Sequence, residues 1–345
     1  MIAKIILGTL TVLAVAGVAS AQTVPLVAED MMVKAADSGI DLFVRNKRPA
    51  SMTVFRPERT VLFVHGATYP AHTIFDLRLD GQSWMEYIAA RGYDVYLLDL
   101  RGYGKSTRPK EMSEEPQKNP PIVRGETAVK DIGSVVDFVL ARRNIPRLNL
   151  LAHSWGSTLM ATYTTQNAAK VERLALYAPP WIRQTPSLVQ AGPGPLAAYR
   201  TVRREQALER WMTGVPESKK AGLIPAGWFD TWAAATFASD PDGAKMNPPV
   251  LRAPNGVVQD GLEFFGAGKP YYDPAKITVP TLLVLGEWDR DTPTYMAQTL
   301  FPLLVNAPGK RMVTLAEGTH SIVLEKNRME LFRAVQAFFD EANGS

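Results

Sequence analysis

The chain has no cysteine and only four histidines in 345 residues. Without cysteine, disulfide bridges and a thiolate nucleophile are both excluded. Any chemistry that needs an imidazole must therefore use His65, His72, His153 or His320. No two of these histidines stand four residues apart around a glutamate, so that zinc motif is missing as well. We expect a protein that works without a metal or another cofactor.

Long runs of like charge are also missing, and the formal net charge is +4. The arginines between residues 200 and 210 follow helical spacing only in part. They are Arg200, Arg203, Arg204 and Arg210. We interpret them as a solvated helix face in preference to a nucleic-acid or anion site, and we expect no nucleic-acid partner.

A phosphate loop is excluded because the motif's leading glycine is missing. The string GYGKST, residues 102–107, would need its leading glycine at position 99, where Asp99 stands. No helical pattern opens after it, as a phosphate loop requires. We interpret Asp99 and Arg101 as residues that organise a turn.

The only long apolar run lies at the start of the chain. Lys4 precedes IILGTLTVLAVAGV, and ASA at positions 19–21 offers small residues for cleavage. The run is shorter than the roughly 20 residues of a membrane-spanning helix. We predict a signal peptide over residues 1–21, cleaved after Ala21, and export to the periplasm or the medium with no stable span in the mature chain. A chain of this length can rely on its core in place of disulfides.

Strand-like and helix-like segments alternate along the rest of the chain. Strands are expected at MTVFRP (52–57), TVLFVHG (60–66), YDVYLLDLRG (93–102), LNLLAH (148–153), VERLALYAP (171–179), TLLVLGEWD (281–289) and RMVTLAEG (311–318). Helices are expected between them, including one over residues 126–143. This order indicates an α/β fold, with a mostly parallel sheet and helices on both faces.

Residues 181–270 break the alternation, because prolines and glycines mark both ends and aromatic residues fill the middle. The segment is too long for a simple crossover. We predict an inserted, mainly helical cap over the carboxyl ends of the strands, which divides the core into residues 22–180 and 271–345.

The segment LNLLAHSWGSTLM, residues 148–160, places Ser154 between an apolar strand and a helical run. A serine there is most often an N-cap. On a sharp strand-to-helix turn, with small residues such as Ala152 and Gly156 two positions away, it is instead an exposed nucleophile.

A serine hydroxyl needs a base, and the base needs an acid that orients it. His320, in EGTHSIV after the last strand, is the candidate base. His153 follows strand alternation and is expected to point away from the serine's side. The segment GEWDRDTP supplies carboxylates after the preceding strand. We favour Asp289 as the acid, since Asp291 can cap the next helix. The order Ser154, Asp289, His320 predicts a Ser-His-Asp triad.

These motifs resemble those of the capped α/β hydrolases, a group that holds esterases, lactonases, epoxide hydrolases and proline iminopeptidases. VHG (64–66) resembles the group's oxyanion loop, DLRGYGKS (99–106) its D-x-R-G-x-G-x-S turn, and GEWDRDTP (286–293) and GTH (318–320) its acid and base segments. The likeness covers nearly the whole mature chain and is weakest in residues 181–270. One departure is Ala152, which replaces the first glycine of the elbow by the least intrusive side chain.

The resemblance implies an α/β-hydrolase fold and acyl transfer, because epoxide hydrolases and dehalogenases of the group use aspartate where this chain has Ser154. The oxyanion is expected to meet the backbone N–H groups of Trp155 and Ala67. The expected reaction is cleavage of an ester or lactone with a small, hydrophobic acyl substrate. Ordinary imidazole titration predicts a rate that rises between about pH 6 and 8.

Further residues are candidates for substrate contact. They are His65, Trp181, Trp228, Phe229 and Trp232. Packing of the cap onto the core is the commoner role of such aromatic side chains.

Two other functions stay open. A proline iminopeptidase would use cap carboxylates such as Glu205, Glu209 or Asp230 to bind a free amine. A protein of this fold can also bind a ligand without turnover.

Overall fold

The computed structural model describes residues 24–190 and 194–341. The predicted signal peptide and its cleavage site after Ala21 lie outside these residues. Within the described part of the chain, no helix is long and apolar enough to cross a bilayer.

An eight-stranded sheet forms the centre of the molecule, in the order β1-β2-β4-β3-β5-β6-β9-β10. Only β2 runs antiparallel to its neighbours, and every other pair is parallel. The strands are β1 (Leu26–Lys34), β2 (Asp41–Pro49), β3 (Thr60–Val64), β4 (Asp94–Leu98), β5 (Leu148–His153), β6 (Val171–Tyr177), β9 (Thr281–Gly286) and β10 (Arg311–Leu315). The prediction of a mostly parallel sheet is confirmed.

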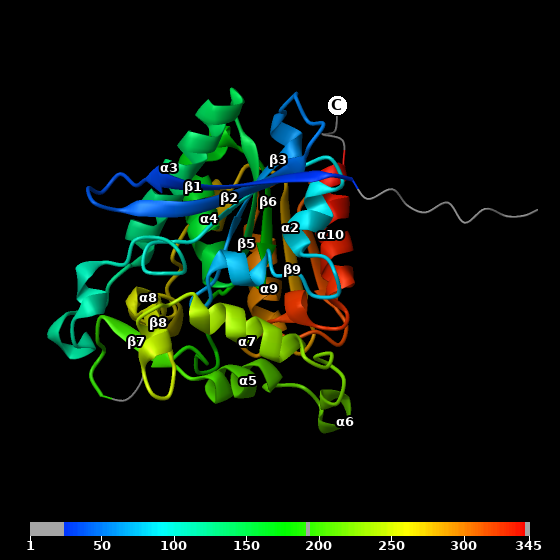
Figure 1. Ribbon diagram of the computed structural model, residues 1–345. Coiled ribbons are helices and arrows are strands. Elements are labelled where there is room, and N and C mark those ends of the chain that lie inside the picture. Colours follow the sequence, from blue (N-terminus) through cyan, green and yellow to red (C-terminus); the bar gives the residue numbers. More distant parts are fainter. Residues whose placement is uncertain (1–23, 191–193, 342–345) are drawn as a thin grey trace, which may run out of the picture.

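Helices cover both faces of this sheet (Figure 1). The main ones are α1 (Ala71–Ile74), α2 (Trp84–Ala89), α3 (Gly125–Arg143), α4 (Trp155–Asn167), α9 (Thr294–Leu300) and α10 (Arg328–Asp340). Along β3, Leu62 and Val64 pack into the cluster with α3 and α4, while Val61 and Phe63 pack into the cluster with α2 and α10. This period of two places an apolar layer on each face, as a sheet buried on both sides requires.

One expectation about the first strands is wrong, and one hairpin was not expected at all. Of residues 52–57, expected as a strand, 52–56 have no regular secondary structure and Pro57 begins a 3-10 helix, Pro57–Arg59. This connection joins β2 to β3, which are separated in the sheet by β4, so it crosses an end of the sheet and pairs with nothing. The β1–β2 hairpin was not expected, because polar and apolar residues alternate only weakly along these two strands.

The inserted segment, residues 181–270, leaves the sheet after β6 and returns at β9. It contains β7 (Tyr199–Val202), α5 (Arg204–Met212), α6 (Glu217–Lys220), α7 (Trp228–Ala238), β8 (Leu251–Pro254) and α8 (Gly256–Glu263). β7 and β8 pair as a two-stranded antiparallel sheet. Figure 1 shows α5 and α7 across one end of the central sheet. The boundaries of a separate cap stay a prediction.

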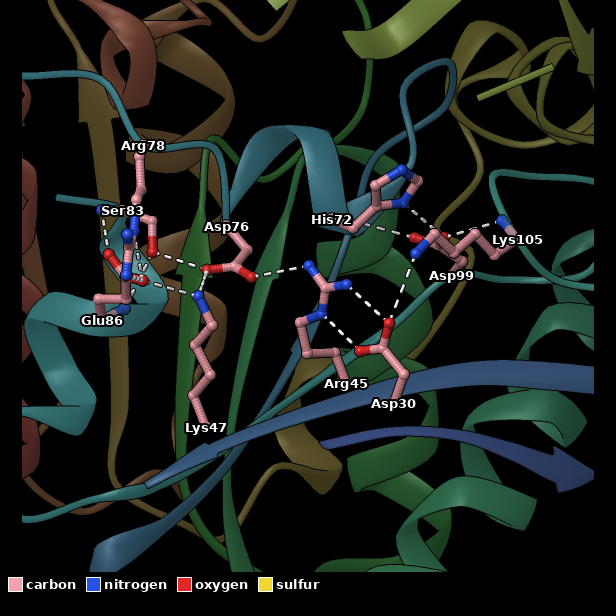
Figure 2. A network of polar contacts seen from close by, with 10 residues as sticks. All are labelled: Asp30, Arg45, Lys47, His72, Asp76, Arg78, Ser83, Glu86, Asp99 and Lys105. Carbon is pink, nitrogen blue, oxygen red and sulfur yellow. Dashed lines mark hydrogen bonds and ion pairs between the residues drawn. The ribbon is translucent and has the colours of Figure 1, made fainter. Parts of the chain in front are cut away.

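A chain of ion pairs joins the β1–β2 hairpin to the segment after β3 (Figure 2). Arg45 lies between Asp30 and Asp76, with nitrogen–oxygen distances of 2.6 and 3.0 Å. Lys47 contacts both Asp76, at 2.7 Å, and Glu86, at 2.8 Å. Because Asp76 and Glu86 are buried, these contacts compensate the loss of water around them. The hairpin is thereby attached to α2.

The same figure shows how Asp99 holds the turn after β4. His72 Nδ1 lies 2.7 Å from Asp99 Oδ2, and the Lys105 N–H donates to the same oxygen at 3.1 Å. A Cβ on Gly104 (φ +52°) would lie only 2.1 Å from that oxygen, so glycine is required there. Arg101 binds the buried carboxylate of Asp131. The amides of this turn therefore face a carboxylate of the protein, in agreement with a structural role for Asp99 and Arg101.

Candidate active site

Ser154 lies on a sharp turn between β5 and α4. Its backbone has φ 57° and ψ −126°, a region that non-glycine residues rarely adopt and that stores strain at functional sites. A Cβ on Gly156 would lie 2.3 Å from the His65 carbonyl oxygen, so the turn can press against the loop after β3 only with glycine there. Ala152 is fully buried within β5, so a methyl group fits at the first position of the elbow.

His320 and Asp289 are joined by a hydrogen bond of 2.7 Å between the imidazole Nδ1 and the carboxylate Oδ2. Asp289 also accepts hydrogen bonds from the Thr292 N–H at 2.8 Å and from the Thr292 hydroxyl at 2.7 Å. The carboxylate is 1% exposed, so these donors fix its orientation. His320 lines the same small cavity as Ser154. The structure thus brings the three predicted residues to one place.

Asp291 has a different environment from Asp289. Arg210, from α5 in the inserted segment, binds both of its oxygens, with distances between 2.7 and 3.1 Å. Burial raises the pKa of Asp291, but the charge and hydrogen bonds of Arg210, together with the charges of His320 and Arg183, bring it below the usual value. Asp291 is therefore held as an ionised partner of Arg210, and it does not cap α9.

The pKa of His320 is raised above its ordinary value of 6.5. Burial by itself lowers this pKa, but the charges of Asp289 and Asp291 and the hydrogen bond to Asp289 more than offset burial. The expectation of an ordinary pKa for His320 is therefore wrong, because Asp291 stabilises the imidazolium in addition to Asp289.

His153 does not point away from the site. Its Nε2 lies 3.1 Å from the His320 carbonyl oxygen, and its ring stacks on Tyr177 with 4.3 Å between centroids. Burial and the neighbouring His320 lower the pKa of His153 well below its ordinary value, so this imidazole is neutral. The Tyr177 hydroxyl donates to the same carbonyl at 2.5 Å, and the two side chains together support the loop that carries His320.

The predicted oxyanion residues, Trp155 and Ala67, line the larger cavity together with Ser154. Trp155 is the first residue of α4, where backbone N–H groups have no partner within the helix. The Ala67 carbonyl accepts hydrogen bonds from the Tyr103 hydroxyl at 2.9 Å and from Arg200 at 2.7 Å. Arg200 comes from β7, so the inserted segment holds the loop after β3 in place.

Two cavities meet at Ser154. The larger one has a volume of about 610 Å³ and is lined by Trp155, Thr158, Arg183 and Phe265 among others. The smaller one, of about 30 Å³, is lined by His320 and Trp232 and has room for about one water molecule. Ser154 itself lines both.

Most of the predicted substrate contacts lie elsewhere. Trp232 lines the smaller cavity, but Trp181 lines a separate surface groove, and Trp228 and Phe229 line neither cavity at Ser154. Phe229 packs on Trp232, with 5.7 Å between ring centroids. His65 is fully buried, its Nε2 accepts the Leu100 N–H at 3.1 Å, and burial lowers its pKa to about 4. Of the five candidates, Trp232 alone lines a cavity at Ser154, and His65 has the contacts of a structural residue.

The acids expected to bind a substrate amine are also remote. Glu205, Glu209 and Asp230 are exposed, and Asp230 forms an ion pair with Arg204. None of the three lines either cavity at Ser154.

The interpretation of the arginines as one solvated face is wrong for two of them. Arg200 is buried and Arg210 is mostly buried, and both reach the loops around Ser154. Arg183 was not predicted at all and lines the larger cavity. The signal that the sequence offered was the irregular spacing of the arginines, which does not match one helix face.

Within the described residues, no three His, Asp or Glu side chains gather as metal ligands.

A model of the family described as "Alpha/beta hydrolase family" matches residues 61–334. The chain belongs to the alpha/beta hydrolase family. The chain is 33% identical over 87 residues to abhydrolase domain-containing protein abhd-5.2 of Caenorhabditis elegans. It is 30% identical over 100 residues to lipase member N of Homo sapiens. The matches cover 25% and 26% of this chain but only 17% and 24% of those relatives.

Solved structures with the same fold cover most of the hydrolase. A bacterial membrane phospholipase A has a TM-score of 0.60 at 19% identity, over 91% of this chain and 86% of that one. A meta-cleavage product hydrolase from Pseudomonas fluorescens IP01 has a TM-score of 0.60 at 15% identity, over 91% and 98% of the two chains. At these identities the likeness shows the fold alone.

Proposed function

We propose that this protein is an exported serine hydrolase that cleaves an ester or lactone through an acyl-enzyme intermediate. The observation that carries the proposal is the 2.7 Å hydrogen bond from His320 to Asp289, beside a serine on a strained turn that lines two cavities. In this reaction Ser154 is the nucleophile, His320 the general base and Asp289 the acid that orients it.

The steps follow from these roles. His320 takes the proton of Ser154 while the serine oxygen attacks the substrate carbonyl, and it later gives this proton to the leaving alcohol. Asp289 stabilises the imidazolium that forms in between. The N–H groups of Trp155 and Ala67 receive the oxyanion. Water then attacks the acyl-enzyme with His320 again as the base. The smaller cavity, beside both Ser154 and His320, is a suitable place for that water.

We further propose that the inserted segment, residues 181–270, is a cap that closes over the substrate. Arg200 and Arg210 support this proposal, because both extend from the segment to loops that flank Ser154. The larger cavity is lined in part by the same segment and would hold most of the substrate.

Aminopeptidase activity ranks second. A free amine needs a carboxylate in the pocket, and the exposed positions of Glu205, Glu209 and Asp230 speak against them in that role. Ligand binding without turnover ranks third, because the polar contacts around His320 are those that a base needs.

A fluorophosphonate probe tests the nucleophile. We expect it to label the folded protein at Ser154 and to leave Ser154→Ala unlabelled, as read by peptide mass spectrometry. Folded wild-type protein that stays unlabelled would favour the binding role. A panel of nitrophenyl esters, lactones and prolyl-arylamides then ranks the activities, and efficient prolyl-arylamide cleavage with weak ester turnover would reverse our order.

Export is tested separately, by mass spectrometry of the protein secreted by its expressing cell. We expect an amino terminus at Gln22. An intact Met1 segment held in the membrane would contradict export as a free protein.

A further inference from the structure

One arginine in the wall of the larger cavity, Arg183, forms no ion pair with any acid of the described residues. Arg183 lines this cavity, and its Nη2 donates a hydrogen bond to the Asp291 backbone carbonyl oxygen at 3.0 Å. Its Nη1 is buried and has no hydrogen-bond partner among the described residues. Burial also lowers the pKa of this guanidinium. A buried cation is normally paired, because an unpaired one loses hydration without compensation.

The acids in the same wall are already engaged. Asp291 binds Arg210 through both oxygens. Asp260 accepts the Gly125 N–H at 2.6 Å and pairs with Arg124. Each carboxylate of the wall therefore has its own arginine as ion-pair partner, and Asp291 attracts Arg183 without forming an ion pair with it.

Two further polar atoms at this cavity lack partners. Trp155 Nε1 and Thr158 Oγ1, both from α4, are buried without a hydrogen bond within the described chain. Buried polar groups of folded proteins are nearly always satisfied, by protein, water or ligand. Three residues that line one cavity, which also reaches Ser154, therefore carry a polar group without a partner, and a ligand with hydrogen-bonding oxygens would supply one to any of them that turns toward the cavity.

We propose that Arg183 binds a carboxylate of the substrate, so that the preferred substrates are esters or lactones carrying a carboxylate away from the scissile bond. A guanidinium suits this task because its N–H groups match the two oxygens of a carboxylate. Since Nη1 is shielded from water, we expect the guanidinium to turn toward the anion on binding. The proposal rests on the proposed function for its choice of ester substrates, and it deepens that function by defining their class.

Matched esters test the proposal. One pair is the mono-4-nitrophenyl ester of suberic acid and its terminal primary amide, and the other is the acetate ester of 3-(4-hydroxyphenyl)propionate and its amide. These place the carboxylate on the acyl side and on the alcohol side. We expect kcat/KM to favour the carboxylate by about 10- to 100-fold in at least one pair, as a charged hydrogen bond would give.

The preference should be lost in Arg183→Gln and partly kept in Arg183→Lys. Arg204→Gln is the matched control, because Arg204 lies in the same segment but on the surface, paired with Asp230. This control should keep the wild-type preference. No preference in either pair, or an equal preference in Arg183→Gln, would overturn the proposal.

A binding measurement separates this proposal from the proposed function. Calorimetry with Ser154→Ala protein compares suberic acid monoamide with suberamide, and it needs no turnover. We expect the anion to bind at least ten times more tightly and to lose this advantage when Arg183→Gln is added. Such a result supports the anion site even if no ester is cleaved. Equal binding of the two compounds would refute the site even if esters are cleaved.

Discussion

At the scale of single residues, two carboxylates in the loop after β9 have different partners. Asp289 binds His320 at 2.7 Å, whereas Asp291 binds Arg210. Only the first can hold the imidazole in the tautomer that accepts a proton from Ser154. The roles of these two acids are therefore separable by experiment.

We expect Asp289→Asn to lower kcat by about four orders of magnitude, because an amide at this position favours the wrong imidazole tautomer. Asp291→Asn should keep most of kcat per folded molecule. It should lower the free energy of unfolding by about 3 kcal/mol, since Arg210 is then buried without its partner. Ester-hydrolysis assays measure kcat, and urea unfolding measures the free energy of unfolding. If Asp291→Asn lowered kcat more than Asp289→Asn, the acid of the triad would be Asp291.

The raised pKa of His320 predicts a shifted pH profile. The base works only when neutral, so kcat/KM rises with pH through the pKa of His320 in the free enzyme. Because that pKa is raised, the midpoint should lie above the ordinary value of 6.5. In Asp291→Asn one of the two stabilising charges is gone and Arg210 still disfavours the cation, so the midpoint should fall. A midpoint that stays in place or rises in this variant would speak against the assigned charges.

At the scale of secondary-structure elements, the site depends on how closely the β5–α4 turn meets the loop after β3. Gly156 is where they touch, since a Cβ there would lie 2.3 Å from the His65 carbonyl oxygen and 2.8 Å from that of Val64. Both of these atoms belong to the backbone, so relieving the clash requires a shift of the backbone itself.

Gly156→Ala should therefore destabilise the protein by about 1–3 kcal/mol and reduce fluorophosphonate labelling of Ser154. Gly133→Ala is the control, because it lies within α3 and the nearest atom to its added Cβ is 3.6 Å away. Alanine in a helix should stabilise by about 0.5–1 kcal/mol. Urea unfolding and probe labelling compare the two variants, and equal effects would show that the contact at Gly156 is not limiting.

At the scale of the whole molecule, α5 connects the inserted segment to both loops of the site. Arg210 binds Asp291 on the loop after β9. Its neighbour Trp211 donates its indole N–H at 2.8 Å to Glu325, which also accepts the N–H of Thr319 at 3.2 Å. Thr319 directly precedes His320, so the position of α5 and the position of the base are coupled.

Glu325 makes this connection sensitive to pH. The carboxyl is fully buried, and burial raises its pKa from 4.5 to about 7. A raised pKa means that the folded protein retains a proton which the unfolded chain releases. Stability from this group is complete below pH 4.5, falls as the pH rises through this window and is lost above pH 7. The whole loss is about 3 kcal/mol.

Glu325→Gln should remove this dependence, because the amide has nearly the same shape and does not titrate. The free energy of unfolding of Glu325→Gln, relative to wild type, should therefore increase between pH 5 and pH 8. Urea unfolding at several pH values measures this difference. A constant difference across that range would show that Glu325 does not titrate there.

Several features of this protein follow from the sequence by itself. The five central strands, β3, β4, β5, β6 and β9, are buried at every position, and a continuous apolar run is a local signal of such a strand. The predicted positions of Ser154, Asp289 and His320 also came from local signals. Each follows a strand, and the carboxyl ends of parallel strands meet at one edge of the sheet.

Only the tertiary structure decided which charged side chains face the site. Arg210 and Asp291 are 81 residues apart, and Arg200 and the Ala67 carbonyl are 133 apart. Whether an arginine stays in water or becomes buried depends on a partner that compensates its lost hydration. Such a partner is supplied from distant segments when the chain folds, and the spacing of the arginines along the sequence does not reveal it. The same holds for Arg183, whose cavity is formed by the inserted segment closing against α4 and the loops of the core.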